Sequence, residues 1–319
     1  MKIGLIDVDN YENLNDCFPN LPLMKLSAWH KAQGDTVEWY QPMFSGHCDR
    51  VYMSKVFSFT EDYPYYIDAD EILRGGSGYC IYLDSDGKEH FDKSKDNELP
   101  YEIEHIMPDY SLYGITDTAY GFMSRGCPRG CDFCHVKDKE GLRSYKVADL
   151  SEFWNGQKYI SLFDPNTLAC KDWKDILQQL VDSKAYVDFN QGVDIRLMTE
   201  EKAEMIKKVK VKGIHFSWDR YEDKDIVVPK FETFKNQTGW GRGKVSAYVL
   251  CGFKEKKVLQ EDLERIMFLR SLDFNPYVML YDKEHIPKGH ELRKLQRWCN
   301  NKIIFWSCST FEEYLKGWC

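Results

Sequence analysis

The feature that most restricts this chain is a group of three cysteines within residues 118–136. Cys127, Cys131 and Cys134 form a Cys-x3-Cys-x2-Cys array directly after the apolar, strand-like residues 119–123. Glycine and proline residues inside the array favour the tight turns that let closely spaced thiolates converge on one centre. Three such ligands satisfy three irons of a cubane [4Fe-4S] cluster and leave the fourth iron open to a substrate.

A structural zinc site is the alternative interpretation of the array. Zinc prefers four ligands, which usually come as two separated pairs. The fourth ligand would have to be His135, which is adjacent to Cys134, or one of the distant cysteines. The spacing therefore favours iron and sulfide, and the zinc interpretation stays open.

The array resembles the signature of the radical S-adenosylmethionine (SAM) superfamily, in which an aromatic residue precedes the third cysteine. Phe133 occupies that position. The resemblance implies a [4Fe-4S] cluster on the three cysteines with SAM bound at the open iron. It also implies reductive cleavage of SAM to a 5′-deoxyadenosyl radical that abstracts a substrate hydrogen, with electrons from a donor such as flavodoxin or ferredoxin.

Length and composition narrow the class of protein. The chain has 319 residues, enough for one large domain or two ordinary ones. It contains no apolar run long enough to span a bilayer, and its start, MKIGLIDVDN, predicts a strand rather than a signal peptide. Eleven cysteines in a chain of this size fit reduced thiols in a cytoplasmic protein. The net charge of −8 gives no general attraction to nucleic acid.

Residues 1–108 are expected to form a small doubly wound α/β domain with a hairpin and a linker. A helix is predicted at residues 21–33, a hairpin at 79–91 and a polar linker at 92–100. The predicted strands are residues 3–9, 37–40, 51–57 and 70–76.

This region resembles the cobalamin-binding-type Rossmann domain that precedes the barrel in one branch of the superfamily. The resemblance lacks the cobalt-ligating motif Asp-x-His-x-x-Gly, because residues 9–14 read Asp-Asn-Tyr-Glu-Asn-Leu. His30 falls inside the predicted helix, and His47 precedes the third strand. We therefore expect no histidine-ligated cobalamin. Cobalamin bound without a protein histidine, and a scaffold or lid without cobalamin, both stay open.

Residues 109–319 alternate between predicted strands and helices. The last residues form a C-terminal helical extension. Six strand–helix units in this order resemble the partial (β/α)6 TIM-type barrel of the radical SAM core. The predicted strands are residues 119–123, 159–163, 187–195, 214–218, 244–250 and 277–281.

The active site of a β/α barrel lies at the carboxyl ends of its strands. By the resemblance, Asp164 and Asn166 stand where the family holds the methionine amino group of SAM. Arg196 could bind the SAM carboxylate in a two-pronged contact. Asp164 could instead form a turn, and Asp194 could pair with Arg196 as a structural ion pair. The candidate cofactor-binding residues are Phe133, Asp164, Asn166, Asp194, Arg196, Ser217 and Gly252.

Other polar segments have more ordinary interpretations. Residues 239–244 are predicted to be a connector, and residues 207–212 a solvated helix end. Lys254, Lys256 and Lys257 follow the fifth strand and could attract an anionic substrate. Among the remaining thiols, core packing competes with an auxiliary cluster on Cys299, Cys308 and Cys319 and with a role in turnover for Cys251.

Three functions stay open after the sequence is read. The first is a radical SAM enzyme without cobalamin, acting on a substrate that the sequence does not identify. The second is a cobalamin-dependent radical SAM methyltransferase. The third is a non-enzymatic iron–sulfur or zinc-binding protein.

Overall fold

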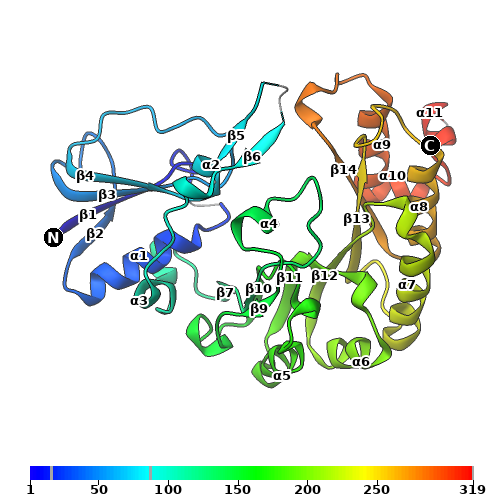
Figure 1. The fold of residues 1–319 in the computed structure, drawn as a ribbon, viewed down its shortest axis with the longest axis horizontal. Coiled ribbons are helices and arrows are strands. Elements are labelled where there is room, and N and C mark those ends of the chain that lie inside the picture. The colour runs from blue at the N-terminus through cyan, green and yellow to red at the C-terminus, as the bar shows by residue number, and fades with distance from the viewer. Residues whose placement is uncertain (15–16, 86–87, 318–319) are drawn as a thin grey trace. The chain divides into compact units, whose positions relative to one another are not determined.

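The computed structural model describes residues 1–14, 17–85 and 88–317. The chain divides into two compact units, Met1–Ile160 and Ser161–Cys319. Parallel sheets flanked by helices make up the fold (Figure 1), as the α/β prediction required. The domain boundary predicted at residues 108–109 lies within the first unit.

The first unit is organised around a four-stranded parallel sheet with the order β2-β1-β3-β4. Helix α1 (Leu21–Ala32) begins at Asn20, whose side chain accepts a hydrogen bond from the Leu23 amide. Leu23 and Leu26 of this helix pack on one face of the sheet. The strands are β1 (Lys2–Asp7), β2 (Thr36–Trp39), β3 (Cys48–Ser54) and β4 (Ala69–Gly75).

The third strand ends earlier than predicted. It stops at Ser54 rather than at residue 57, because the Val56 and Phe57 amides donate to the carboxylate of Asp9, at 2.6 and 3.4 Å. Those amides are therefore turned toward the loop after β1 and away from the sheet.

The predicted hairpin is also shorter than expected. Tyr79 and Cys80 belong to the single-turn helix α2 (Ser77–Cys80), so only β5 (Ile81–Leu83) and β6 (Glu89–Phe91) form the antiparallel pair. Residues 86 and 87 of its turn lie outside the described part of the chain. The rest of the first unit contains η1 (Lys93–Lys95), α3 (Tyr101–Glu104), η2 (Tyr110–Tyr113), β7 (Thr118–Gly121), β8 (Ser124–Arg125), α4 (Val136–Lys139), β9 (Tyr145–Lys146) and η3 (Leu150–Glu152).

The larger sheet has six strands in the order β14-β13-β12-β11-β10-β7, which follows the order of the chain. The pairs from β11 to β14 are parallel. Residues 211 and 212, predicted to end a helix, instead begin β12, because α6 stops at Lys208. The strands after β7 are β10 (Tyr159–Leu162), β11 (Tyr186–Val193), β12 (Val211–Ser217), β13 (Val245–Cys251) and β14 (Asn275–Leu280).

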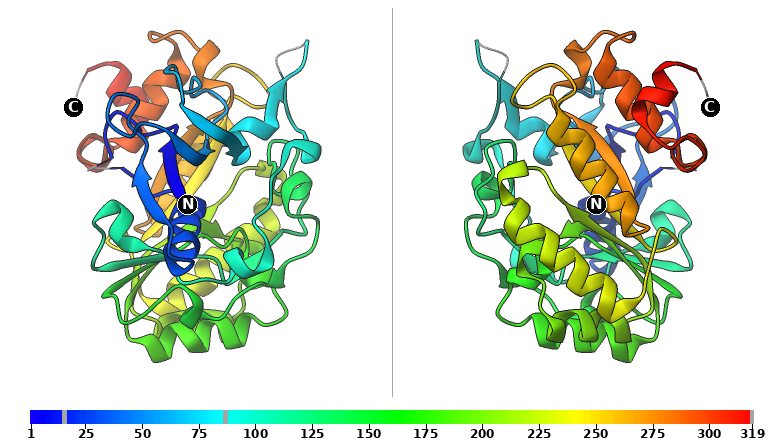
Figure 2. Two further views of the ribbon diagram at one scale, coloured as in Figure 1. Left: turned by 90° about the vertical axis from the view of Figure 1, so that its left-hand side faces the viewer. Right: turned by 90° about the vertical axis from the view of Figure 1, so that its right-hand side faces the viewer.

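Helices alternate with these strands and pack on one face of them. Phe216 of β12 contacts the rings of Phe231 and Phe234 in α7, and Figure 2 (right) shows α7 and α8 in front of the strands. Alternate residues of β12 and β13 are buried, and those between them are half-exposed. The elements are η4 (Thr167–Ala169), α5 (Trp173–Ser183), η5 (Ile195–Leu197), α6 (Glu200–Lys208), η6 (Tyr221–Asp223), α7 (Lys224–Thr238), α8 (Gln260–Ser271), η7 (Lys283–His285), α9 (Glu291–Asn300), α10 (Lys302–Ser307) and α11 (Phe311–Leu315).

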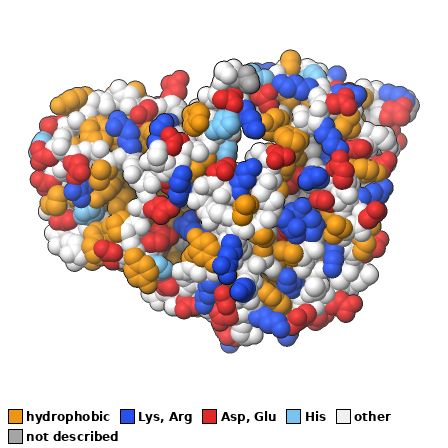
Figure 3. Space-filling model, in the orientation of Figure 1, with side chains coloured by type: hydrophobic (Ala, Val, Ile, Leu, Met, Phe, Trp, Pro, Cys, Tyr) orange, Lys and Arg blue, Asp and Glu red, His pale blue; other side chains and the backbone are white. Residues whose placement is uncertain are grey.

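Two surface properties bear on partners. Within the described ranges, no helix combines the length and the hydropathy needed to cross a lipid bilayer. On the face seen in Figure 3, Lys and Arg side chains are interspersed with Asp and Glu.

Gly76, which directly follows β4, provides a test of the close backbone packing beside the first sheet. Its φ is +96°, and a Cβ built there would lie 2.3 Å from the carbonyl oxygen of Lys55. We predict that Gly76→Ala lowers the free energy of unfolding by roughly 1–3 kcal/mol more than Gly34→Ala, because only the first variant is overpacked. Gly34 has a φ of +82°, and no atom lies within 4 Å of the place that a Cβ would take, so it controls for backbone strain alone. Urea denaturation measures both, and equal losses would contradict the prediction.

Candidate cofactor site

The three cysteines lie on a loop whose two ends are joined by strands β8 and β9. Ser124 pairs with Lys146 and Arg125 with Tyr145 in an antiparallel ladder. Residues 126–144 therefore form a closed loop that starts and ends at the β8–β9 pair. Cys127, Cys131 and Cys134 are half-buried on this loop, which we call the cysteine loop. Phe133 is also half-buried there.

Backbone contacts fix the start of the cysteine loop. Gly126 has a φ of +77°, and a Cβ at this position would lie 2.1 Å from the carbonyl oxygen of Arg143. Only glycine fits such an approach. The Cys127 amide donates to the Gly141 carbonyl at 3.3 Å, and the Cys134 amide donates to the Cys131 carbonyl at 3.1 Å. The first of these contacts ties the two halves of the loop together, and the second turns the chain between two of the cysteines.

An ion-pair network supports the base of the cysteine loop. The Glu140 carboxylate accepts a hydrogen bond from the Gly126 amide at 2.9 Å and pairs with Arg125 at 3.1 Å. Arg125 also pairs with Glu104 at 3.0 Å, and Glu104 pairs with Lys25 at 3.1 Å. Burial by itself would raise the pKa of Glu104, but Lys25 and Arg125 lower it below its usual value. The network therefore holds Glu104 ionised and Arg125 fixed beside the loop.

The donor set of the cysteine loop fits an iron–sulfur cluster in kind, since one glycine-turned segment carries three thiols. Within the described ranges, however, no three or more His, Cys, Asp or Glu side chains are arranged to hold a metal ion. His135, the residue needed by the zinc interpretation, has its Nε2 3.2 Å from a carboxylate oxygen of Glu89.

The other candidate residues belong to the second unit. Asp164 follows β10, is buried, and accepts a hydrogen bond from the Thr167 hydroxyl at 3.3 Å. Asn166 donates from Nδ2 to Asp194 Oδ2 at 3.5 Å. The structure thus brings Asn166 and Asp194 together after β10 and β11.

Arg196 is held by two carboxylates. Its Nε lies 2.8 Å from Asp194 Oδ1, and its Nη1 lies 3.0 Å from Asp223 Oδ2. Burial alone would lower the pKa of Arg196, but Asp194 and Asp223 raise it. The structural ion pair that the sequence allowed is therefore present. A ligand carboxylate would have to compete with Asp194 and Asp223 for the guanidinium.

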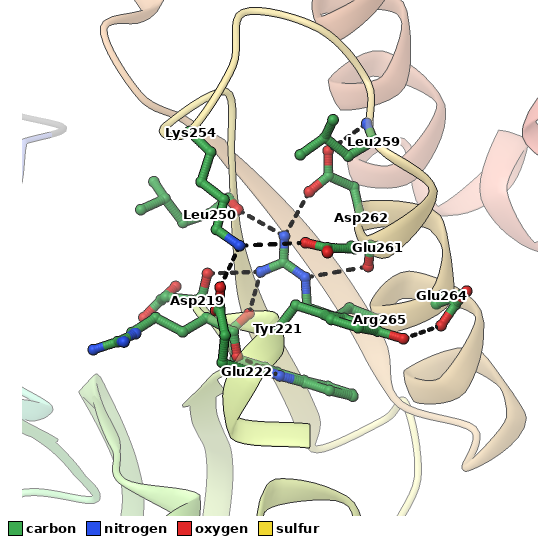
Figure 4. A network of polar contacts seen from close by, with 12 residues as sticks. Asp219, Tyr221, Glu222, Leu250, Lys254, Leu259, Glu261, Asp262, Glu264 and Arg265 are labelled. Carbon is green, nitrogen blue, oxygen red and sulfur yellow. Dashed lines mark hydrogen bonds and ion pairs between the residues drawn. The ribbon is translucent and has the colours of Figure 1, made fainter. Parts of the chain in front are cut away.

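Arg265 organises the carboxyl ends of two neighbouring strands. It is 3% exposed and donates to the carbonyl oxygens of Trp218 at 2.7 Å, Asp219 at 2.9 Å and Leu250 at 3.0 Å (Figure 4). It also pairs with Asp262 at 2.6 Å. One buried side chain therefore fixes the segments in which β12 and β13 end.

The segments held by Arg265 include two candidate residues. Ser217 is the last residue of β12, and Gly252 directly follows β13. Burial raises the pKa of Asp219, although a hydrogen bond from Ser217 and the charge of Arg265 oppose the rise. The sequence reading missed Asp219, Asp223 and Arg265. Asp262 and Arg265 are three residues apart in a predicted helix, and this spacing could have indicated from the sequence that Arg265 forms an ion pair.

The lysines after β13 are matched by carboxylates. Lys254 pairs with Glu222 and Glu261, as Figure 4 shows. Lys256 pairs with Asp282 at 2.8 Å, and Lys257 pairs with Glu255 at 2.6 Å. These contacts offset the positive charge that was expected to attract an anionic substrate.

Two cysteines outside the loop pack as small apolar side chains. Cys251 is 1% exposed, and burial raises the pKa of its thiol. Burial also raises the pKa of the Cys299 thiol, which donates to the Pro276 carbonyl at 3.5 Å. Cys308 is buried and disulfide-bonded, so it departs from the expectation of reduced thiols and is not available as a cluster ligand in this state, and Cys319 lies outside the described residues.

Neither His30 nor His47 fits the role of a cobalt ligand. His30 lies in α1, with its ring nitrogens 2.7 Å from Asp35 and 3.0 Å from Tyr52. His47 precedes β3, and its ring nitrogens lie 2.9 Å from Asp68 and 3.2 Å from Asp70. Ligands of doubly wound domains bind at the carboxyl ends of the strands, whereas His47 is at the amino end of β3.

No protein-family model matches the chain, and no curated protein sequence matches it.

The Glu140 contact gives a test of loop support. We predict that Glu140→Ala speeds amide hydrogen exchange in residues 126–134 by about tenfold, because one charge-assisted hydrogen bond is worth roughly 1.5–3 kcal/mol. Asp138→Ala, a carboxylate removed from α4 in the same loop, is the matched control. Exchange is followed by mass spectrometry. Similar acceleration in both variants would show that the Gly126–Glu140 contact does not hold the loop.

Proposed function

We propose that this protein is a radical SAM enzyme whose cofactor is a [4Fe-4S] cluster on Cys127, Cys131 and Cys134. The observation that carries the proposal is the cysteine loop itself, which follows β7 of a sheet whose six strands succeed one another in chain order. That order supports a partial (β/α)6 barrel as the finer description of the larger sheet. The four-stranded sheet supports a Rossmann-like N-terminal domain, with the role of scaffold or lid.

Each group of residues has a defined task under this proposal. The three thiolates hold three irons, and Glu140 and Arg125 keep the loop in place. When bound, the cluster and SAM supply one-electron chemistry that removes a hydrogen atom from a substrate, with a flavodoxin or ferredoxin as electron donor. Asp164 and Asn166 would supply oxygen atoms for the SAM amino group. Thiolate ligands also favour the reducing cytoplasm as the location.

The cluster is tested by changing its ligands together. We predict that the anaerobically purified protein shows a broad iron–sulfur absorption band, and that changing Cys127, Cys131 and Cys134 to Ala together removes it, because iron would lose all three thiolates. Cys17→Ala, a half-buried cysteine of the same unit, is the control and should keep the band. Iron and sulfide are measured chemically. Full iron and sulfide in the triple variant would contradict the proposal, and zinc lost in their place would support the zinc interpretation.

SAM binding is tested at Arg196. We predict that SAM perturbs the electron paramagnetic resonance signal of the reduced cluster. Arg196→Ala should weaken SAM binding by about tenfold or more, since charge-assisted hydrogen bonds contribute roughly 1.5–3 kcal/mol. Arg242→Ala, which removes an exposed arginine paired with Asp273, is the control. Equilibrium dialysis gives both affinities. Unchanged binding in Arg196→Ala would leave this residue with only its ion pairs to Asp194 and Asp223.

A further inference from the structure

The face of β11–β13 opposite the helices carries polar side chains at neighbouring positions. Strands of parallel sheets are usually apolar on both faces. Here Asp188, His215 and Ser246 follow one another on β11, β12 and β13, and each is half-buried. Polar groups at such positions need an explanation beyond packing.

The register of the sheet brings these three side chains together, since Asp188 is opposite Gly213, two residues before His215 on the same face of β12. His215 is opposite Ser246, and its Nδ1 lies 2.5 Å from Ser246 Oγ. On the other side of the ring, His215 Nε2 lies 3.3 Å from Asp188 Oδ1. Gly213 leaves room for the carboxylate, because a Cβ there would lie 3.0 Å from Asp188 Oδ1. The hydroxyl of Ser246, the imidazole of His215 and the carboxylate of Asp188 therefore follow one another, each next to the one before.

The Asp188 carboxylate oxygen nearest the imidazole lacks a hydrogen-bond donor. Asp188 Oδ1 is buried and accepts no hydrogen bond. The distance of 3.3 Å to His215 Nε2 is within ion-pair range, but the alignment of a hydrogen bond is lacking. A buried acceptor without a donor is costly. Asp188 Oδ1 lies beside His215 Nε2, on the side of the ring away from Ser246, which is where a carboxylate can orient the imidazole.

Aromatic rings fix the orientation of the imidazole. Tyr248 stacks on His215 with ring centroids 5.7 Å apart and an interplanar angle of 16°. Tyr277 meets Tyr248 edge-on at 5.8 Å. Burial, assisted by Asp188 and Tyr277, raises the pKa of Tyr248. The phenol therefore stays neutral and does not compete for the proton.

We propose that Ser246 and His215 are catalytic residues of a second site, oriented by Asp188, which transfers acyl groups from small esters to the Ser246 hydroxyl. Oγ forms a bond to the carbonyl carbon while its proton moves to His215 Nδ1. The carbon–oxygen bond to the leaving alcohol breaks, and His215 returns the proton to that oxygen. Water then attacks the acyl-serine, with its proton passing to His215, and release of the acid restores Ser246. The step uses residues of the second unit alone and needs no cluster.

The test uses a fluorophosphonate probe on the full chain. The probe should phosphonylate Ser246, as located by peptide mass spectrometry, at a rate that falls by about 100-fold in His215→Ala, since general base catalysis contributes 10²–10⁴-fold. Ser183 is the reference serine, because its hydroxyl donates to the Leu180 carbonyl at 2.7 Å at the end of α5. Labelling of Ser246 no faster than that of Ser183 overturns the proposal.

The role of Asp188 is separated from a structural one by charge. Asp188→Asn keeps the side-chain shape and should slow labelling at least tenfold, whereas Asp188→Glu should restore part of the rate. Hydrolysis of p-nitrophenyl acetate should fall in the same order. Circular dichroism checks that each variant is folded. If His215→Ala is unfolded, the labelling rate of Asp188→Asn tests the proposal in its place. Equal rates in Asp188→Asn and in the unchanged chain overturn the relay.

Discussion

The hydrogen bond from the Gly126 amide to the Glu140 carboxylate, 2.9 Å long, is the interaction on which the cysteine loop depends. Glu140 is in turn paired with Arg125, the residue in which β8 ends. The acceptor in the hydrogen bond from Gly126 is an ionised carboxylate, and hydrogen bonds to ionised groups are stronger than neutral ones. This hydrogen bond joins Gly126, where the loop begins, to Glu140 on the returning half of the loop, and all three cysteines lie between these residues in the chain.

A comparable device operates at the carboxyl ends of β12 and β13. Arg265 donates to three main-chain carbonyl oxygens, two of which, those of Trp218 and Asp219, follow the end of β12. A buried charge is costly unless it is paired, and Asp262 supplies the pair. The result is a rigid set of strand ends carrying Ser217, Asp219 and Gly252. Rigid placement is what a binding site built on strands requires.

Arg196 shows how stability and binding compete for one side chain. Its contacts with Asp194 and Asp223 satisfy a half-buried guanidinium. The same donors would be needed by a ligand carboxylate, so binding would have to break or share existing ion pairs. An arginine already oriented by two carboxylates is nevertheless placed with little loss of side-chain entropy.

The sequence by itself determined the class of the fold and the cysteine loop. Local patterns predict both. Alternating apolar residues indicate the strands, helical periodicity indicates the helices between them, and Cys127, Cys131 and Cys134 beside turn-forming glycines indicate the loop. The tertiary structure alone decided which distant groups meet. β3 ends at Ser54 because the Asp9 carboxylate accepts from two amides beyond it. Asp188, His215 and Ser246 meet because the register sets His215 opposite Ser246 and Asp188 opposite Gly213, two residues before His215. Periodicity specifies which face a side chain occupies, but the partner across a sheet depends on strand order and register, which long-range packing fixes.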